Sequence, residues 1–312
     1  MKTTKIERDK SLQKVFVTGI TGKSGLFFFD EIKQQKNEKM EFTCLVRDES
    51  KAKWLMDAMP EIKVCIGSLD DKALIHKIFT DADFDTVLHI AGISRSLDLV
   101  KEAIDASVKW LVLVHTTGIF SKYKAAGENY RQIENKIELM RKGKDVSLTI
   151  LRPTMIYGNL HDGNIAVFIK MVYKMRIFPV VNNARYELQP VWCGDLGKAY
   201  YQVLVNSDKT KDKNYNLSGG SPIMLIDMLK VMANKLGVKN RFVNVPFWIA
   251  YSGAWLLYLF SIGRIDFREK VQRLVEPRIF DHFEAQRDFG YQPVDFEQGV
   301  DSEIRDFQKS HQ

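Results

Sequence analysis

The stretch "VTGITGKSG", residues 17–25, follows a short apolar run and carries three glycines spaced three residues apart. Two classes of nucleotide-binding turn share parts of this pattern. The segment Gly22-Lys23-Ser24 matches the last three residues of the P-loop of a nucleoside triphosphatase. The spacing of Gly19, Gly22 and Gly25 is instead typical of a dinucleotide-binding turn.

The P-loop interpretation fails on one position. A P-loop requires a further glycine five residues before Gly22, so that several backbone N–H groups wrap the phosphates. Val17 occupies that position. The apolar run 86–90 also continues into Ala91-Gly92 and offers no aspartate suited to holding Mg²⁺. The sequence therefore argues strongly against a nucleoside triphosphatase.

The dinucleotide interpretation fits the context. The turn follows a predicted strand and opens a helix predicted over residues 24–35. Gly19 permits the tight turn, Gly22 lets the backbone approach a pyrophosphate, and Gly25 allows the helix to pack closely on the strand. The helix N-terminus adds N–H groups and a partial positive charge. We therefore predict an NAD(P) site.

Short apolar, β-rich runs alternate with amphipathic stretches through the first half of the chain. These runs cover residues 15–17, 42–46, 63–66, 86–90, 111–114 and 148–151. This alternation predicts an α/β fold with a Rossmann-type doubly wound parallel sheet. We predict an NAD(P)-binding domain over 14–155 and a smaller C-terminal substrate-binding region over 156–312. In the second region a helix is expected over 223–236, capped at Ser221-Pro222.

The end of the second predicted strand bears on the choice of cofactor. It reads Leu45-Val46-Arg47-Asp48. An arginine there accommodates the 2′-phosphate of NADP(H), whereas an acidic residue accepts from the ribose 2′-OH of NAD(H). Arg47 comes first and Lys51 and Lys53 lie nearby, so NADP(H) is favoured over NAD(H). Asp48 as the ribose ligand is the alternative.

Composition limits the partners. The 312 residues are 45% hydrophobic and carry 46 Lys and Arg against 39 Asp and Glu, a net charge of +7. The basic residues are scattered, so we expect a solvated basic surface and no nucleic-acid partner. The mild positive field favours phosphate-bearing ligands.

Cysteine and histidine usage predicts no metal site and a reducing compartment. Cys44, Cys65 and Cys193 lie far apart without C-x-x-C spacing, and the six histidines show no ligand spacing. His89 and His115 are expected in the core or beside the cofactor. Residues 1–14 carry charges of both signs and do not resemble a secretory signal. The expected location is cytoplasmic.

One segment, 242–263, contains no formal charge. Its length approaches the roughly 20 apolar residues of a membrane-spanning helix, but Asn244, Pro246, Ser252 and Gly253 interrupt it. Three interpretations stay open: a core or substrate-pocket helix, an interfacial membrane helix, and a span. The interfacial one would give peripheral membrane contact.

Several motifs together resemble a known family. They are "VFVTGITGKSG", "CLVRD", "GSLDD", "LHIAG", "TILRPTMIYG" and "RDFGYQPVDFEQGV", in this order. The chain resembles the extended and atypical short-chain dehydrogenase/reductases, the NAD-dependent epimerase/dehydratase group, from about Lys14 to Val300.

The resemblance implies a cofactor site at matching positions. Gly19, Thr21, Gly22, Lys23, Ser24 and Gly25 would line the pyrophosphate, Arg47 would meet the 2′-phosphate, Ser68 and Leu69 would lie beside the adenine, Ala91 and Gly92 would lie along the ribose and nicotinamide side, and Pro153 would border the nicotinamide. Most members have apolar residues in place of Lys23 and Ser24, and an aspartate in place of Ser68.

The implied catalytic set departs from the family. Members use a Ser or Thr after the fifth strand, a tyrosine that transfers a proton, and a lysine four residues later. Thr117 and Tyr130 match the first two, but Glu134 stands in place of the lysine. Tyr123, followed by Lys124, is an alternative pair, and the absence of any catalytic tyrosine is a third.

Two functions follow from the resemblance. The first is an NADP(H)-dependent oxidoreductase or epimerase acting on a small molecule, a sugar nucleotide or a related glycan or lipid-linked precursor. The second is a non-catalytic NADP(H)-binding sensor or scaffold of the atypical branch, which Glu134 favours. A homodimer is kept open in both.

Overall fold

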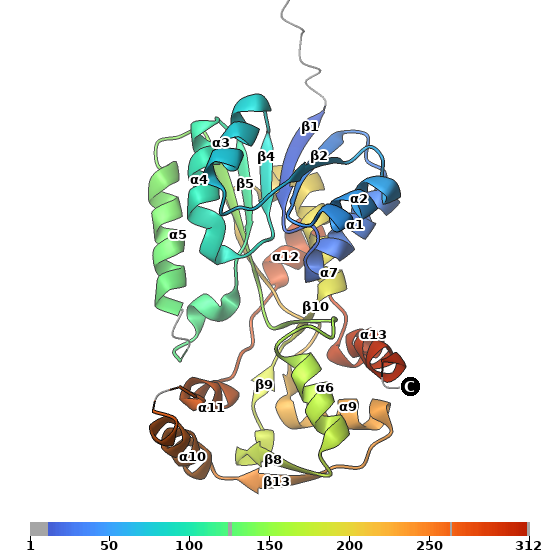
Figure 1. Cartoon of the computed structure of the whole chain (residues 1–312), viewed down its shortest axis with the longest axis vertical. Coiled ribbons are helices and arrows are strands. Elements are labelled where there is room, and N and C mark those ends of the chain that lie inside the picture. Colours follow the sequence, from blue (N-terminus) through green and yellow to red (C-terminus); the bar gives the residue numbers. More distant parts are fainter. Residues whose placement is uncertain (1–11, 124–126, 263, 311–312) are drawn as a thin grey trace, which may run out of the picture. The chain divides into compact units, whose positions relative to one another are not determined.

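The computed structural model describes residues 12–123, 127–262 and 264–310. Its central element is a seven-stranded sheet with the strand order β11-β6-β5-β4-β1-β2-β3 (Figure 1). The strands are β1 (Gln13–Thr18), β2 (Met40–Val46), β3 (Lys63–Ile66), β4 (Thr86–His89), β5 (Trp110–Val114), β6 (Ser147–Pro153) and β11 (Asn214–Leu217). The predicted Rossmann-type parallel sheet is confirmed. Each of the six predicted runs lies within or overlaps one of these strands.

The chain divides into two compact units. Unit 1 holds Met1–His115, Ile133–Ile150 and Lys211–Lys213, and unit 2 holds Thr116–Gln132, Leu151–Thr210 and Asn214–Gln312. Each unit is described by itself below.

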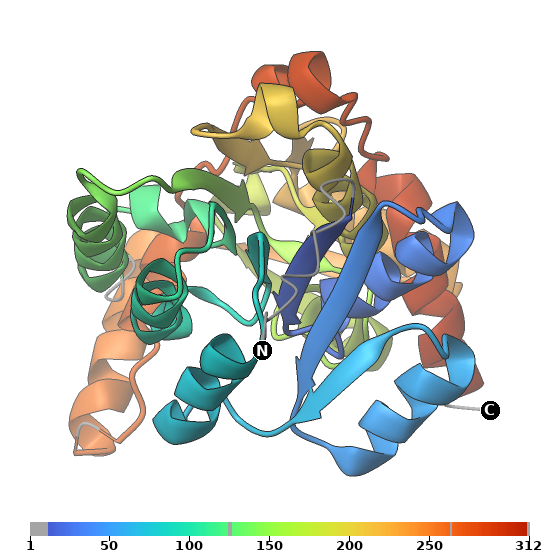
Figure 2. The ribbon, with the colours of Figure 1, turned by 90° about the horizontal axis from the view of Figure 1, so that it is seen from above.

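Helices cover both faces of the sheet in unit 1 (Figures 1 and 2). They are α1 (Lys23–Gln35), α2 (Glu49–Ala58), α3 (Lys72–Asp81), α4 (Ser96–Asp105) and α5 (Gly127–Arg141), whose first turns fall in unit 2. Two short 3-10 helices follow β4 and β5, namely η1 (Ile93–Arg95) and η2 (Thr117–Phe120) in unit 2. Because β1, β2, β4 and β5 are apolar almost throughout, most of their residues are buried under these helices, whereas β3 at the edge of the sheet is more exposed.

Aromatic rings fill much of the unit 1 core. Phe16 of β1 packs at 5.2 Å from Phe79 and 5.1 Å from Phe84, measured between ring centroids. On another part of the sheet, Phe28 of α1 meets Phe42 of β2 edge to face at 5.9 Å. Offset and edge-to-face contacts of this kind add to the stabilisation that burial alone provides.

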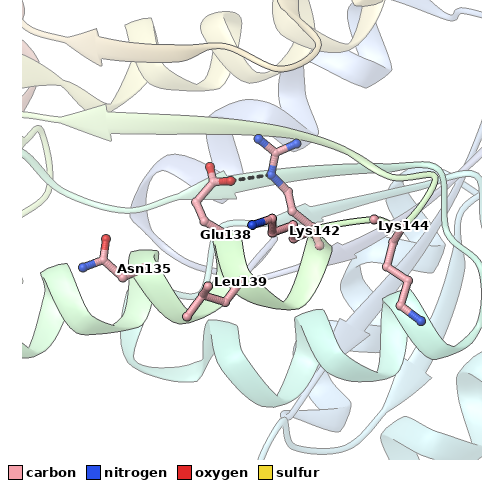
Figure 3. A pocket seen from close by; sticks show the side chains of 7 residues that line it. Asn135, Glu138, Leu139, Lys142 and Lys144 are labelled. Atoms are coloured by element: carbon pink, nitrogen blue, oxygen red, sulfur yellow. Dashed lines mark hydrogen bonds and ion pairs between the residues drawn. The ribbon is translucent and has the colours of Figure 1, made fainter.

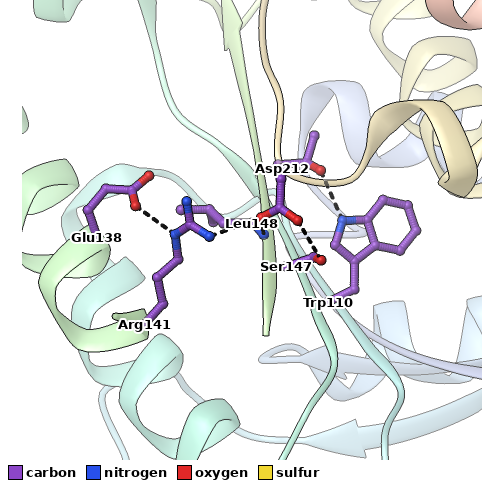
Figure 4. A network of polar contacts seen from close by, with 7 residues as sticks. Trp110, Glu138, Arg141, Ser147, Leu148 and Asp212 are labelled. Atoms are coloured by element: carbon purple, nitrogen blue, oxygen red, sulfur yellow. Dashed lines mark hydrogen bonds and ion pairs between the residues drawn. The ribbon is translucent and has the colours of Figure 1, made fainter. Parts of the chain in front are cut away.

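A polar network fixes the end of α5 to the start of β6 (Figure 4). Arg141 contacts Glu138 and donates to Oδ1 of Asp212 at 2.9 Å. Asp212 also accepts from the Ser147 hydroxyl at 2.8 Å and from the Leu148 N–H at 3.1 Å. Its carboxylate therefore links the segment around Asp212 to the end of α5 and the start of β6, which lie 64 to 71 residues earlier in the chain.

Unit 2 contains shorter elements. Its strands are β7 (Ile156–Tyr157), β8 (Ile177–Val181), β9 (Glu187–Leu188), β10 (Val191–Trp192), β12 (Ile223–Met224) and β13 (Arg241–Val245). Its helices are α6 (Ile165–Lys174), α7 (Cys193–Val205), α8 (Ser207–Thr210), α9 (Leu225–Leu236), α10 (Phe247–Phe260), α11 (Arg268–Leu274), α12 (Phe283–Phe289) and α13 (Phe296–Lys309), with the 3-10 helix η3 (Asn182–Ala184). Residues of α6, α9 and α13, among them Ile169, Met228 and Phe307, form its core.

The start of α9 differs from the sequence-based expectation. Ile223 and Met224 form a strand that pairs with β9, and the helix begins at Leu225 with Met224 as its N-cap. Ser221, expected as the cap, donates its hydroxyl to Asp295 at 2.6 Å. The prediction of the cap was wrong because Ile223 and Met224 pair with β9, which lies far back in the chain, and are therefore not part of the helix.

Candidate functional site

The carboxyl ends of β1 and β4 lie side by side in unit 1. The two strands are parallel, and Thr18, the last residue of β1, is in register with His89, the last residue of β4. The strand order reverses here, because β2 and β3 extend to one side and β5 to the other. In open α/β sheets this reversal marks the crevice that receives a nucleotide.

Gly19 allows the loops that follow these two strands to touch. Its φ is +84°, in the region that favours glycine. A Cβ placed on Gly19 would lie 2.7 Å from the backbone N of Ala91 and 2.9 Å from the carbonyl carbon of Ile90. The structure thus brings Gly19 and Ala91, both predicted site residues, into direct contact.

The other two glycines bring the start of α1 onto the turn. The N–H of Gly22 donates to the Gly19 carbonyl at 2.9 Å, and Gly22 is the N-cap of α1. A Cβ on Gly25 would lie only 2.2 Å from the Gly19 oxygen, so the helix packs against the turn backbone. At Gly22 the nearest atom to such a Cβ is that same oxygen, at 3.1 Å.

The N-terminus of α1 suits an anion. Its first turn, as the structure describes it, carries no acidic residue, and no side chain caps it at Gly22. Gly22 and Lys23 are exposed, whereas Ser24 is buried and Thr21 is half-buried. The 13-residue helix places the positive end of its dipole at this exposed rim, together with the Lys23 ammonium group. A diphosphate therefore fits the residues present.

His89 connects the two strand ends. Its side chain is fully buried, with Nδ1 2.7 Å from the Thr18 hydroxyl and Nε2 3.0 Å from the Gly92 carbonyl. A carbonyl only accepts, so Nε2 carries the proton and the Thr18 hydroxyl donates to Nδ1. Burial lowers the pKa of His89 to about 4, which keeps the ring neutral near pH 7. The expectation that His89 lies in the core is confirmed.

Arg47 and Asp48, the two residues that follow β2, have different surroundings. Asp48 is the N-cap of α2, and its Oδ1 accepts from the Lys51 N–H at 2.9 Å. Arg47 is exposed directly after β2. The carboxylate that could serve a ribose 2′-OH is therefore engaged in a helix cap.

After β3, a polar contact links two loops. Ser68, one of the predicted adenine-side residues, donates to Asp70 at 3.1 Å, and Leu69 between them is half-buried. Asp70 in turn accepts two hydrogen bonds from Arg95 of η1, both at 3.0 Å. Sequence reasoning missed this bidentate pair, which joins the loop after β3 to the segment after β4.

Two further predicted residues meet in unit 2. Thr117, at the start of η2, is buried and donates its hydroxyl to the Pro153 carbonyl at 3.3 Å. Thr116 caps η2 by accepting from the Gly118 N–H at 3.0 Å. Of the two threonines that follow β5, Thr116 therefore has a local structural role, and Thr117 faces the end of β6.

Glu134, in the position where the family has lysine, is buried in unit 1. Its Oε1 lies 2.9 Å from Nδ1 of His115, and Nε2 of His115 lies 3.1 Å from the Ser96 hydroxyl. All three side chains are buried. His115 is thus a core residue, as expected, and Glu134 is held by a partner 19 residues earlier in the chain.

The two candidate tyrosines differ in exposure. Tyr130 is half-buried within α5, one helical turn before Glu134. Tyr123 is 42% exposed in the loop after η2. Lys124, its proposed partner, lies outside the described residues. The catalytic roles of Thr117, Tyr130 and Tyr123 stay predictions.

Asp195 of α7 is a buried carboxylate of unit 2. Its Oδ2 accepts from the Val294 N–H at 3.0 Å. Burial raises the pKa of Asp195 to about 6, although the Val294 hydrogen bond and Lys198 act in the opposite direction. This contact joins α7 to the segment before α13 and gives the unit a group that titrates near neutral pH.

A cavity of about 740 Å³ lies at the amino ends of the strands, opposite the end that carries the glycine turn (Figure 3). It is lined by the end of α5 and the turn before β6, including Leu139, Lys142 and Lys144. Because β6 begins just after this turn, the cavity lies at the amino ends of the strands, away from Gly19.

Within the described ranges, no group of three or more His, Cys, Asp or Glu could hold a metal ion.

Comparison with known proteins agrees with this geometry. Residues 19–169 match the family model described as NAD(P)H-binding. The chain therefore carries a domain of the NAD(P)H-binding kind over these residues. This domain contains the glycine turn, α1 and the loop after β4. The search of curated proteins found no match.

Solved structures of the same fold include sugar-nucleotide enzymes. The UDP-glucose 4-epimerase of Thermotoga maritima, with UDP-glucose, is 17% identical with a TM-score of 0.71 over 96% of this chain and 100% of that one. The dTDP-glucose 4,6-dehydratase of Bacillus anthracis, in complex with NAD, is 14% identical with a TM-score of 0.72 over 96% and 97%. The UDP-glucose 4-epimerase of Thermus thermophilus, with NAD, is 16% identical with a TM-score of 0.68 over 95% and 99%. The chain therefore shares its fold with these proteins.

None of the described helices is both long and apolar enough to cross a membrane.

Proposed function

We propose that the chain binds NADP(H) at the turn after β1 and acts as an oxidoreductase or epimerase on a sugar nucleotide or a related glycan or lipid-linked precursor. The observation that carries the proposal is the contact between Gly19 and Ala91 beneath the uncapped N-terminus of α1. This arrangement leaves backbone N–H groups and a positive dipole at the crevice of the sheet.

Five of the predicted residues hold the phosphates of the cofactor in this proposal. The backbone at Gly22, the Lys23 ammonium group and the hydroxyls of Thr21 and Ser24 hold the pyrophosphate. Arg47 holds the 2′-phosphate, because a guanidinium matches phosphate geometry in a bidentate manner. Its exposure and the engagement of Asp48 in the α2 cap support NADP(H) over NAD(H). When bound, the nicotinamide supplies or accepts a hydride.

Two observations support the substrate class. The similar structures include enzymes of UDP-glucose and dTDP-glucose. The net charge of +7 also favours a substrate that carries phosphates. For the proton transfer we propose Tyr130, with Thr117 as the accompanying hydroxyl, on the basis of their spacing after β5.

A second candidate function is favoured by Glu134. A lysine at this position would supply a positive charge, whereas Glu134 supplies a carboxylate that is already paired with His115. We therefore keep, as the alternative, an NADP(H)-binding protein that senses the cofactor or serves as a scaffold without turnover.

Cofactor titration and a substrate panel test both candidates. We expect NADPH fluorescence to change on binding and nucleotide-linked keto-sugars to be reduced, with epimerised products detected by chromatography. Tyr130→Phe should abolish turnover while leaving NADPH affinity unchanged. Binding without turnover on any substrate would support the sensor, and failure to bind either NADPH or NADH would overturn the proposal.

A further inference from the structure

Helix α10 presents an unusual surface. From Phe242 to Gly263 the sequence contains no charged residue, and Gly263 alone in this segment lies outside the described residues. The large apolar side chains of α10 are nevertheless exposed: 84% for Phe260 and 69% for Trp248. Among the α10 residues only Ala254 is buried. A helix of this composition is normally buried in a core.

The exposed side chains share one broad face. At 3.6 residues per turn, Tyr251, Ala254 and Tyr258 lie together, and this face packs on α11. The Arg268 guanidinium of α11 lies 3.8 Å from the Tyr258 ring centroid. The opposite side is the α10 apolar face, formed by Trp248, Ile249, Trp255, Leu256, Leu259 and Phe260.

The helix is held in place at its start. The Phe247 N–H donates to Oδ1 of Asn182 in η3 at 2.8 Å. The preceding strand, β13, pairs in parallel with β8 over its whole length. In unit 2, therefore, β8 and η3 fix where α10 begins.

We propose that the α10 apolar face binds the surface of an anionic phospholipid bilayer, with the helix lying in the plane of the interface. Its 14 residues span about 21 Å, less than the roughly 30 Å of a hydrocarbon core. Trp248 and Trp255 are of the type enriched at membrane interfaces. A broad apolar face bordered by basic residues is the pattern of interfacial helices.

Charge complementarity favours lipid as the occupant. Cationic residues border the helix on both sides in sequence, namely Arg241, Arg264, Arg268, Lys270 and Arg273. Asp266 and Glu269 pair with two of them, and the chain as a whole carries +7. Anionic headgroups attract such a border. A second copy of the chain would instead bring like charges together across a two-fold interface.

Vesicle flotation with the full chain tests the proposal. The vesicles are phosphatidylcholine alone or phosphatidylcholine mixed with phosphatidylserine. We expect binding to the mixed vesicles, weakened by added salt, with a blue shift of tryptophan emission. Trp248→Glu and Phe260→Glu should each lower the vesicle affinity about tenfold or more, because each removes a large apolar group that the bilayer would bury. The matched control is Leu139→Glu, which changes an exposed apolar residue of α5 and should bind as the parent does.

Several outcomes would overturn the proposal. These are no flotation with either vesicle, equal binding to both kinds of vesicle, and binding that Phe260→Glu leaves intact. Sedimentation without vesicles tests whether a second copy of the chain covers the α10 apolar face instead. A dimer that Phe260→Glu converts to a monomer would assign the face to that second copy. An NADPH titration of each variant shows that the fold is retained, since Trp248 and Phe260 are not among the proposed cofactor residues.

Discussion

The carboxylate of Glu134 lies 2.9 Å from Nδ1 of His115, and both side chains are buried. The two side chains share a buried hydrogen bond. Glu134 therefore contributes to the packing of α5 on the segment after β5 in unit 1. The position at which the family has a lysine serves here to satisfy a buried histidine.

Glu134→Ala is expected to lower the free energy of unfolding by about 1–3 kcal/mol, because Nδ1 of His115 loses its buried hydrogen-bond partner. Glu134→Gln keeps an acceptor and should lose less. Urea unfolding followed by circular dichroism measures both variants. Glu128→Ala, on the exposed side of the same helix, is the control and should change little. Equal losses for Ala and Gln would show that the hydrogen bond to His115 contributes little.

Gly22→Val is expected to lower NADPH affinity about tenfold or more, because a branched side chain would cover the N–H groups at the start of α1. The fold should survive, since φ at Gly22 is −80° and the one close contact of a Cβ, 3.1 Å from the Gly19 oxygen, requires a shift of only a few tenths of an ångström. Fluorescence titration measures the affinity. Gly163→Val, where a Cβ meets nothing within 4 Å, should bind as the parent does. Normal binding by Gly22→Val would mean that the cofactor lies elsewhere.

Arg47→Ala is expected to weaken NADPH by about tenfold to a hundredfold, through the loss of charge-assisted hydrogen bonds worth about 1.5–3 kcal/mol. The affinity for NADH should scarcely change, because NADH has no 2′-phosphate. Titration of both cofactors gives the ratio. Lys53→Ala removes a nearby positive charge and should move the ratio much less. Equal affinity of the parent chain for NADPH and NADH would contradict the role of Arg47.

His89 makes unfolding depend on pH in one direction. Its pKa of about 4 in the folded chain lies below the ordinary value of 6.5, so the unfolded chain takes up the proton first. Its stabilising contribution is complete above pH 6.5 and is lost as the pH falls towards 4, by about 3 kcal/mol in total. Urea unfolding at a series of pH values should show His89→Gln losing less stability over this range than the parent. Parallel curves for the two proteins would exclude the effect.

Asp195 makes the free energy of unfolding depend on pH in the opposite direction to His89. Its pKa of about 6 in the folded chain lies above the ordinary 3.8, so the folded chain holds the proton longer. The contribution of Asp195 to the free energy of unfolding should therefore fall, by about 2–3 kcal/mol, as the pH rises from 4 to 6. Asp195→Asn removes this loss and keeps an oxygen that can accept from the Val294 N–H. We expect the variant to exceed the parent at pH 7 and to match it at pH 4, as measured by thermal unfolding in the two buffers.

The sequence predicted the sheet because its strands are short apolar runs whose pattern is local. The strand around Phe16 and the helix after Gly22 begin and end within two residues of expectation. The glycine turn was predictable for the same reason, since backbone conformation at Gly19 depends on a few neighbouring residues. The cap of α9 was not, because Ile223 pairs with Leu188, 35 residues away.

Contacts between residues that are distant in sequence could also not be predicted from the sequence. The spacing from Tyr130 showed that Glu134 departs from the family, but nothing in the sequence identified His115 as its partner. The pair of Asp70 with Arg95 arises only once the ends of β3 and β4 lie on one edge of the sheet. The side-chain roles at such positions depend on tertiary packing, whereas periodicity reports only which residues are buried.

The imidazole of His89 has a consequence for the thermodynamics of ligand capture. By connecting Thr18 to the Gly92 carbonyl, it orders the two loops of the crevice while the chain folds. A ligand that arrives later meets a preorganised receptor and loses little conformational entropy on ordering it. Loosening this contact should therefore appear in calorimetry as a more unfavourable entropy of binding, even where the enthalpy of the phosphate contacts is unchanged.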